Sequence, residues 1–177
     1  LDYFCTTGLE EIDYLITDDY LAPAGSDAFY SETLLRLTPG RLCYTPPPAP
    51  TPSTEGVEAR RLVCLNRFSK INDEVAAAWS AALLRLPGWS LRLKGTGGDD
   101  AGVANALRRR FAAHGVDPKR LDISGEGPYA EAIDAYGDTA VALDPFPFSG
   151  CATSFDALWM GLPVVTLPLD TMASRQT

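Results

Sequence analysis

The residues best suited to chemistry in this 177-residue chain lie in two short segments. In the first, Asn66, Arg67 and Lys70 stand between a strand-like run and a helix-like run. A lysine beside the free N–H groups of a helix start directs a full charge and several partial charges at one anion, which suits a phosphate. The residue types and their position leave a second interpretation open, in which Arg67 and Lys70 are solvated loop charges.

The second segment follows an apolar run that ends at Asp144, and it combines a glycine with small residues at the start of a helix. These residues are Gly150, Cys151, Ala152 and Thr153. Glycine allows close backbone approach to a ligand, and Asp156, one turn later, can accept the hydroxyls of a ribose. The alternative is structural: Thr153 only caps the helix and Asp156 only complements its dipole. Local physics alone favours this alternative, because caps are common.

The elements that must position these segments alternate regularly after residue 60. Strands are expected at 61–68, 89–95, 120–124, 140–144 and 163–167, and helices at 73–86, 99–114, 128–136 and 153–160. Such alternation requires parallel strands joined by crossover helices. We therefore predict an α/β fold with a Rossmann-like, doubly wound parallel sheet, whose ligand binds beyond the carboxyl ends of the strands. The chain has neither a GxGxxG nor a Walker lysine motif, so it lacks the usual dinucleotide and P-loop fingerprints.

Composition and charge exclude several classes of protein. Hydrophobic residues make up 46% of the chain and charged residues 21%, which argues against disorder. The formal net charge is −8, so we expect neither a nucleic acid nor a membrane as a partner. Residues 1–57 hold nine acidic and two basic side chains, so the basic groups available to an anionic ligand belong to the rest of the chain.

The four cysteines are dispersed and form no CxxC pair. With only one histidine in the chain, neither a zinc site nor a disulfide framework is indicated, and a reducing compartment, the cytoplasm, is expected. The chain opens without an initiator Met or a secretory signal, and it ends directly after a strand-like run and a turn. We therefore expect both ends to be cut from a longer protein.

One proline-rich stretch marks a boundary within the chain. Six of the fourteen prolines fall between Pro39 and Pro52, a composition typical of an extended, semi-rigid connector. We accordingly divide the chain into residues 1–45, a linker at 46–57, and a ligand-binding lobe at 58–177 that is truncated at its C-terminal end.

Longer motifs resemble a known enzyme family. DPFPFSGCATSFDALWMGLPVVTLPLDTMASR is similar to the donor-binding segment of the protein O-GlcNAc transferases, and LNRFSKIND to that family's Asn-x-x-x-Lys-Ile loop. The opening TTGLEEIDYLITDDYLAP resembles the end of the family's first catalytic lobe. The resemblance, closest to the bacterial, tetratricopeptide-linked branch, implies a GT-B glycosyltransferase in which residues 58–177 bind UDP-GlcNAc and residues 1–45 are a remnant of the N-terminal lobe.

The resemblance also implies a role for each site residue. Lys70 would contact the diphosphate and stabilise the leaving group, Thr153 would hold phosphate, and Asp156 would bind the uridine ribose. The full donor-binding set would be Asn66, Arg67, Ser124, Gly125, Gly150, Cys151, Ala152, Thr153 and Asp156, with no metal and no other cofactor. Thr6, Thr7 and Gly8 would border the sugar site.

The chain departs from the family at three places. Cys151 and Ala152 stand where the family has an imidazole or glycine and a first threonine. The segment 127–136 lacks the Lys and His of animal members. The family's first lobe supplies an active-site His, whereas the only histidine here, His114, precedes Gly115 at a predicted helix end, where capping is expected rather than catalysis. Four aromatic residues that flank apolar strands are expected to pack rather than to stack on a base: Trp89, Phe146, Phe148 and Trp159.

Two functional hypotheses follow. The first is an inverting, metal-independent transferase region that moves N-acetylglucosamine from UDP-GlcNAc to protein Ser or Thr hydroxyls, acting with an N-terminal lobe and a helical-repeat domain of the same protein. The alternative is a non-catalytic UDP-sugar-binding or scaffolding module, which Cys151 and Ala152 favour.

Overall fold

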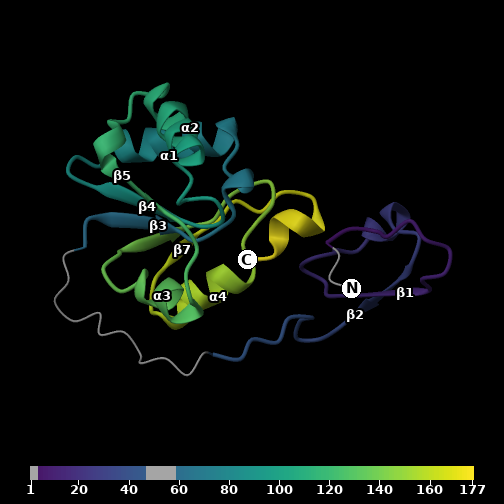
Figure 1. Ribbon diagram of the computed structural model, residues 1–177. Coiled ribbons are helices and arrows are strands. Elements are labelled where there is room, and N and C mark those ends of the chain that lie inside the picture. The colour runs from purple at the N-terminus through teal and green to yellow at the C-terminus, as the bar shows by residue number, and fades with distance from the viewer. Residues whose placement is uncertain (1–3, 47–58) are drawn as a thin grey trace.

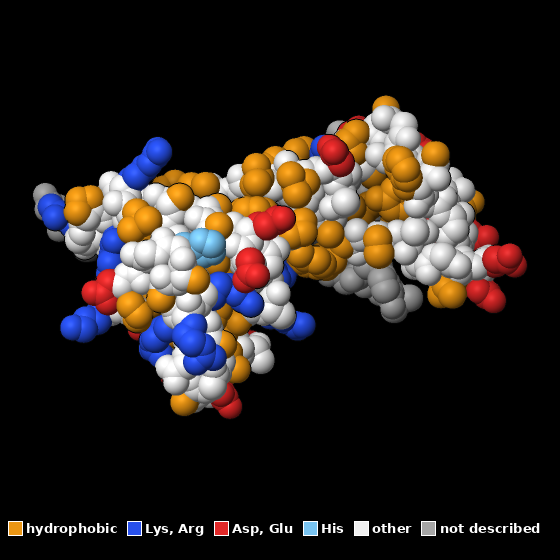
Figure 2. Space-filling view, turned by 90° about the horizontal axis from the view of Figure 1, so that it is seen from above, with side chains coloured by type: hydrophobic (Ala, Val, Ile, Leu, Met, Phe, Trp, Pro, Cys, Tyr) orange, Lys and Arg blue, Asp and Glu red, His pale blue; other side chains and the backbone are white. Residues whose placement is uncertain are grey.

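The computed structural model describes residues 4–46 and 59–177. They form a larger unit with a central sheet and a smaller unit built from the N-terminal residues (Figure 1). Of the predicted linker at 46–57, all but its first residue lies outside the described residues. Most Lys and Arg side chains on the face in Figure 2 belong to the larger unit, as the uneven charge of the sequence predicts.

The smaller unit contains two parallel strands, which the sequence analysis did not anticipate. They are β1 (Tyr14–Thr17) and β2 (Thr33–Arg36), in register from Tyr14 opposite Thr33 to Thr17 opposite Arg36. A 3₁₀ helix, Ser26–Phe29, lies on the connection between them. Leu21, Ala22 and Leu34 form a small core with Met172 from the far end of the chain. The C-terminal segment therefore packs against the smaller unit.

The larger unit has a five-stranded parallel sheet in the order β5-β4-β3-β6-β7. Its strands are β3 (Arg61–Cys64), β4 (Ser90–Lys94), β5 (Leu121–Ser124), β6 (Val141–Leu143) and β7 (Val164–Val165). The chain moves outward from β3 to β5 and then returns to the other side of β3 through β6 and β7. This confirms the predicted doubly wound α/β fold and puts the switch point between β3 and β6, where such sheets bind ligands.

Four helices cover the two faces of this sheet. Helices α1 (Asp73–Leu84) and α2 (Ala101–Ala112) lie on one face, and α3 (Tyr129–Asp134) and α4 (Ala152–Trp159) on the other (Figure 1). The side chains of Asn72 and Asp100 cap the N-termini of α1 and α2. Asn72 accepts a 2.8 Å hydrogen bond from the backbone nitrogen of Val75, and Asp100 accepts one of 2.7 Å from the backbone nitrogen of Gly102. No helix among the described residues is long and apolar enough to cross a membrane.

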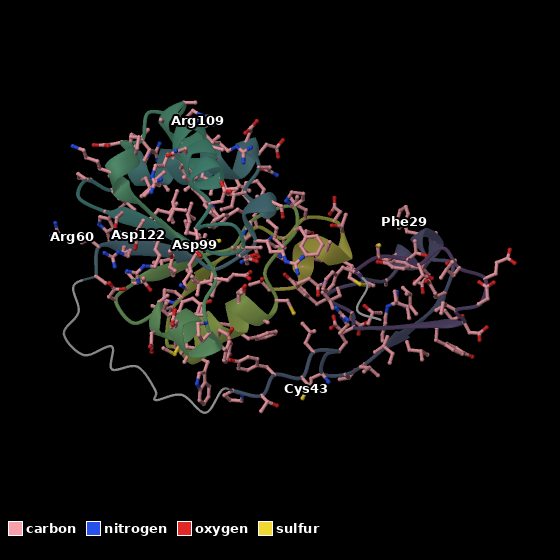
Figure 3. The ribbon with its side chains drawn as sticks, viewed as in Figure 1. Phe29, Cys43, Arg60, Asp99, Arg109 and Asp122 are labelled. Atoms are coloured by element: carbon pink, nitrogen blue, oxygen red, sulfur yellow. The ribbon has the colours of Figure 1, made fainter. Side chains whose placement is uncertain are left out.

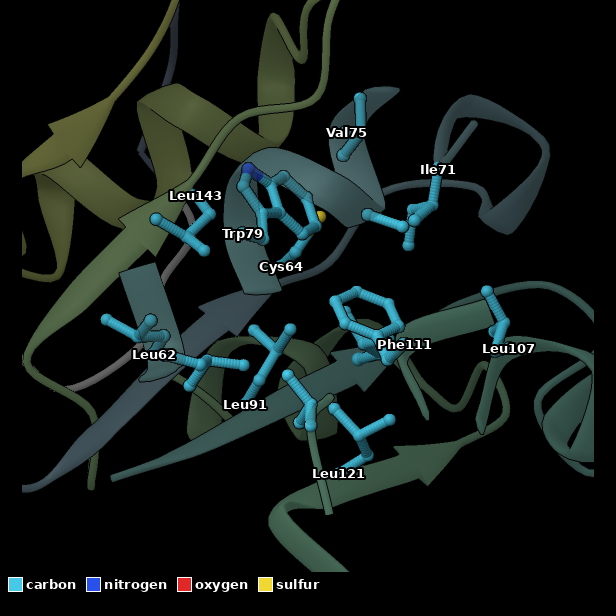
Figure 4. Packing of buried hydrophobic residues seen from close by; sticks show 14 of the residues in the cluster. Leu62, Cys64, Ile71, Val75, Trp79, Leu91, Leu107, Phe111, Leu121 and Leu143 are labelled. Carbon is cyan, nitrogen blue, oxygen red and sulfur yellow. The ribbon is translucent and has the colours of Figure 1, made fainter. Parts of the chain in front are cut away.

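Separate apolar cores lie on the two faces of the sheet. In Figure 4, Leu62, Leu91 and Leu121 extend from neighbouring strands toward Trp79 of α1 and Phe111 of α2. The opposite core joins strand residues to α3 and α4 and comprises Val63, Ile133, Tyr136, Ala142, Ala157, Met160 and Leu162. Strands β3 and β6 contribute side chains to both cores, so they read as apolar runs in the sequence.

One predicted boundary is clearly too long. The strand expected at 61–68 ends at Cys64, where its pairing with β4 ends, and the chain turns through a 3₁₀ helix, Phe68–Lys70. This early turn matters for the site, because it brings Asn66 and Lys70 over the carboxyl edge of the sheet instead of continuing along it.

Candidate functional site

Lys70 lies at the switch point with its ammonium held on three sides. Its Nζ donates a 2.7 Å hydrogen bond to the backbone oxygen of Ser149 and one of 3.1 Å to Oδ1 of Asn66. The same nitrogen lies 4.3 Å from the centroid of the Phe148 ring, a cation–π distance. Two segments separated by about 80 residues of sequence thus fix one positive charge beyond β3 and β6.

Asn66 links this lysine to helix α4. The Asn66 side chain is buried, and its Nδ2 donates a 3.1 Å hydrogen bond to Oγ1 of Thr153 in the first turn of α4. The backbone oxygen of Thr153 accepts a 2.8 Å hydrogen bond from the hydroxyl of Tyr136. The N-terminal turn of α4 is therefore held beside the Lys70 ammonium, and a helix start next to a cation suits an anion.

The turn that enters α4 is tightly packed around Gly150. A Cβ atom on Gly150 would lie 2.7 Å from Oγ of Ser154 and 2.8 Å from Oδ1 of Asp144, so only glycine fits without displacing a neighbour. Ser149 is buried in the same turn, and its hydroxyl accepts a 2.8 Å hydrogen bond from the backbone nitrogen of Gln176. The C-terminal segment thereby supports the turn from behind.

Cys151 has an unusual backbone conformation at the N-cap position of α4. Its φ is 69° and its ψ is −111°, which makes it the one non-glycine residue with positive φ among the described residues. A side chain in this region costs conformational energy that the surrounding packing must offset. Ala152 follows as an exposed first residue of the helix.

A cavity of about 370 Å³ opens at this point, a size in the range of small-molecule sites. Five residues of the predicted set line it: Asn66, Arg67, Lys70, Gly150 and Thr153. The predicted set includes none of the other lining residues Lys94, Gly95, Glu126 and Gly127, although the last three lie in loops that follow predicted strands. Lys94 is the last residue of β4. It could have been predicted, because ligands of such sheets bind at the carboxyl ends of the strands.

A second cavity of about 570 Å³ adjoins the first, with Arg67, Lys70 and Gly150 lining both. Its further walls include Phe148 and Phe4, whose ring centroids lie 5.3 Å apart in an edge-to-face contact. Because Phe4 belongs to the smaller unit, both units enclose this cavity. Lys70 is thus positioned to contact ligand groups on either side of it.

Burial and charge act in opposite directions at the site. Loss of solvent lowers the pKa of Lys70 below its ordinary value of 10.5, and the nearby Asp144 carboxylate opposes this shift. Burial also raises the pKa of Asp144, against the influence of Thr166 and Lys70. Asp144 accepts a 2.8 Å hydrogen bond from the hydroxyl of Thr166. An incoming dianion would favour the charged form of Lys70.

The remaining residues of the predicted set are not among the described residues that line the first cavity: Ser124, Gly125, Cys151, Ala152 and Asp156. Ser124 ends β5, and the backbone nitrogen of Gly125 donates a 3.0 Å hydrogen bond to the Asp99 carboxylate. Asp99 lies on the loop between β4 and α2 (Figure 3). Asp156 is buried and bonded to the hydroxyls of Tyr44 and Tyr129.

Three other expectations have mixed outcomes. His114 is exposed just beyond α2, as predicted for a helix end, and it is not among the residues that line either cavity. Thr6 and Thr7 bind the carboxylate of Glu32, and their place beside a sugar site stays a prediction. Trp89 and Phe146 pack against the core, but Phe148 and Trp159 are substantially exposed, because Phe148 faces Lys70 rather than an apolar strand.

Several side chains must lie close together to bind a metal ion. Within residues 4–46 and 59–177, no group of three or more His, Cys, Asp or Glu side chains is arranged to hold a metal ion.

Comparison with known proteins gives consistent results. At 31% identity, 96% of the chain matches a probable UDP-N-acetylglucosamine–peptide N-acetylglucosaminyltransferase, SEC, from Arabidopsis thaliana. The corresponding SPINDLY protein of Petunia hybrida is 32% identical over 94% of the chain. A solved structure of a mutant O-GlcNAc transferase from Thermobaculum terrenum aligns with 98% of the chain at 41% identity and a TM-score of 0.93. The chain spans 18% of each plant protein and 34% of the bacterial structure.

The family model named glycosyl transferase family 41 matches residues 58–177, which contain both segments of the site. Given this match and the similarity over nearly the whole chain, the protein described here belongs to glycosyl transferase family 41.

Proposed function

We propose that this chain forms the nucleotide-sugar half of a protein O-GlcNAc transferase. The observation that carries the proposal is the Lys70 ammonium, held by Asn66 and Ser149 beside the first turn of α4 at the edge of a cavity of about 370 Å³. A fixed cation and helix N–H groups suit a diphosphate. The names of the relatives support UDP-GlcNAc as donor and a peptide as acceptor.

In the proposed reaction, an acceptor Ser or Thr oxygen attacks the anomeric carbon as the bond to the UDP oxygen breaks, with inversion. The electron pair of that bond moves to the β-phosphate, and the hydroxyl proton passes to a base. Lys70 and the N–H groups at the start of α4 stabilise the negative charge that builds on the phosphate. These groups supply the positive potential that the leaving group needs, so we propose a reaction without a metal ion.

The reaction requires partners outside this chain. Because the chain covers less than a fifth of its plant relatives, we propose that a complete N-terminal lobe closes the site and binds the acceptor. We also propose that the same protein contains a helical-repeat domain and that it is located in the cytoplasm.

A second candidate is a UDP-sugar-binding module without activity. Cys151 and Ala152 favour it, because neither adds a hydroxyl or an imidazole at the start of α4. The deciding experiment incubates the full-length protein with radiolabelled UDP-GlcNAc and acceptor peptides, with and without EDTA. Chelator-resistant transfer that Lys70→Met abolishes supports the transferase. Saturable UDP binding without transfer supports the module, and the absence of both rejects the two proposals.

A further inference from the structure

Two tyrosine hydroxyls meet at one oxygen of Asp156. Tyr44 donates a 2.7 Å hydrogen bond to Oδ1, and Tyr129 donates one of 2.6 Å to the same atom. Tyr129 begins α3, whereas Tyr44 lies just before the predicted linker at 46–57, 112 residues from Asp156. The Tyr44 ring also stacks on Phe155, with centroids 5.4 Å apart and an interplanar angle of 27°.

The two oxygens of the Asp156 carboxylate have different surroundings: Oδ1 accepts both tyrosine hydrogen bonds, and Oδ2 accepts neither. Each carboxylate oxygen has about two lone-pair sites, so the two tyrosines saturate Oδ1. Among the described residues no donor reaches Oδ2, and Oδ2 is not one of the fully buried atoms left without a partner. A ligand hydroxyl can therefore bind Oδ2 without displacing either tyrosine.

Both tyrosines remain donors at neutral pH. Loss of solvent and the hydrogen bond to Asp156 raise the pKa of Tyr129 to about 12. The same two causes raise the pKa of Tyr44. Since neither phenol ionises near pH 7, both hydroxyls keep the protons that they donate to Oδ1.

The segment that carries Tyr44 is anchored from both units. The backbone nitrogen of Arg41 donates a 3.0 Å hydrogen bond to Asp18, and the Arg41 side chain donates one of 2.9 Å to Gln176. Figure 3 shows Cys43 on this segment, where it passes from the smaller unit toward α4. The hydrogen bonds of Arg41 therefore hold the backbone close to Tyr44, which contacts Asp156.

Asp156 lies next to the first cavity. Thr153, which lines that cavity, precedes Asp156 by one turn of α4, and Gly127, which also lines it, precedes Tyr129 by two residues. A ligand whose phosphates occupy the cavity can extend along α4 and bring a hydroxyl-bearing group to Oδ2.

We propose that Tyr44 and Tyr129 are positioning residues that hold Asp156 so that its Oδ2 accepts the ribose hydroxyls of the bound nucleotide. This inference rests on the proposed function, because it requires that a nucleoside diphosphate occupies the site. It assigns a donor-binding task to a residue that lies outside residues 58–177.

The test compares two ligands in the full-length protein by calorimetry: UDP and 2′,3′-dideoxy-UDP, which lacks both ribose hydroxyls. We expect the wild type to prefer UDP by about tenfold or more, the effect of losing hydrogen bonds to a charged group. Tyr44→Phe and Tyr129→Phe should each reduce this preference several-fold, and the double variant should nearly abolish it. Tyr136→Phe is the matched control: its hydroxyl binds the backbone of Thr153 and not Asp156, so this variant should change the affinities for both ligands by the same factor and leave their ratio unchanged.

The control separates positioning from general damage. If the two tyrosines only stabilise the fold, their variants should lose affinity for both ligands by the same factor. An unchanged ratio of the two affinities would therefore overturn the inference. Tighter UDP binding by Tyr44→Phe would also overturn it, because Tyr44 would then compete with the ligand. A wild type that binds UDP but does not discriminate against the dideoxy ligand contradicts this inference alone, whereas a wild type that binds neither ligand contradicts the proposed function as well.

Discussion

The side-chain amide of Asn66 donates a 3.1 Å hydrogen bond to the hydroxyl of Thr153. Through this contact the loop after β3 is joined to the helix after β6, on the two sides of the switch point of the sheet. The same Asn66 side chain accepts a hydrogen bond from Lys70. One buried amide thus sets the relative position of the cation and the helix start that we propose to bind the diphosphate.

Asn66→Ala should therefore weaken UDP binding without abolishing folding. Lys70 loses an acceptor and Thr153 loses a donor, so we expect a loss of about 1–2 kcal/mol in binding free energy, measured by calorimetry. Asn105→Ala, on the exposed face of α2, serves as the control and should bind UDP like the wild type. Equal affinities of the Asn66 variant and the wild type would show that the bridge does not position the site.

The ring of Phe148 should contribute to the position of the Lys70 charge. Phe148→Leu keeps an apolar side chain but removes the cation–π contact, so UDP affinity should fall by about twofold to fivefold. Phe4→Leu removes the edge contact with Phe148 and the cation–π contact with Arg41, but it leaves the Phe148 ring beside Lys70, so it should have a smaller effect on the same titration. If the Phe4 variant lost as much affinity as the Phe148 variant, closure between the units rather than the cation–π contact would explain the loss.

The positive φ of Cys151 predicts an order of stabilities at the start of α4. Cys151→Gly and Cys151→Ala both remove the thiol, but only glycine adopts a φ of 69° without a steric penalty. In urea denaturation, the glycine variant should be more stable than the alanine variant by about 1 kcal/mol. A more stable alanine variant would mean that this turn relaxes to negative φ.

Glu32 predicts an acid-dependent contribution to stability in the smaller unit. Hydrogen bonds from Thr7, opposed by burial, lower its pKa from 4.5 to about 2. Because the folded pKa is the lower one, the stabilisation is complete above pH 4.5 and is lost as the pH falls from about 4.5 toward about 2. Denaturation of Glu32→Gln and the wild type across this range should show a difference in stability that shrinks on acidification. A difference independent of pH would contradict the assignment.

The sequence was sufficient to predict the core of the fold and the centre of the site. Apolar runs alternating with amphipathic helices specified the parallel sheet, and the loops after its strands contain Lys70, Gly150 and Thr153, which the structure brings together. This worked because the ligand edge of a doubly wound sheet follows from strand direction alone.

Contacts between distant segments could not be predicted in this way. The hydrogen bond from Tyr44 to Asp156 depends on where the segment before the predicted linker at 46–57 crosses α4, and no local sequence pattern indicates that path. The β1–β2 pair was missed for a related reason: its parallel strands are joined through a 3₁₀ helix, Ser26–Phe29, and not through the α-helical crossover that marks the larger sheet in the sequence. Phe148 was assigned to packing because its exposure depends on the turn that precedes α4.

The central claim is that Lys70 binds the diphosphate, and one titration tests it most directly. UDP affinity is measured by calorimetry from pH 7 to pH 10 in the full-length protein and in Lys70→Met. Because burial lowers the pKa of Lys70, its charge is lost at lower pH than that of an ordinary lysine. Lys70→Met should bind about tenfold or more weakly at pH 7, and the ratio of the two affinities should shrink as the pH rises, because only the wild type has the Lys70 charge to lose. Equal affinity and the same pH dependence in both proteins would contradict the account.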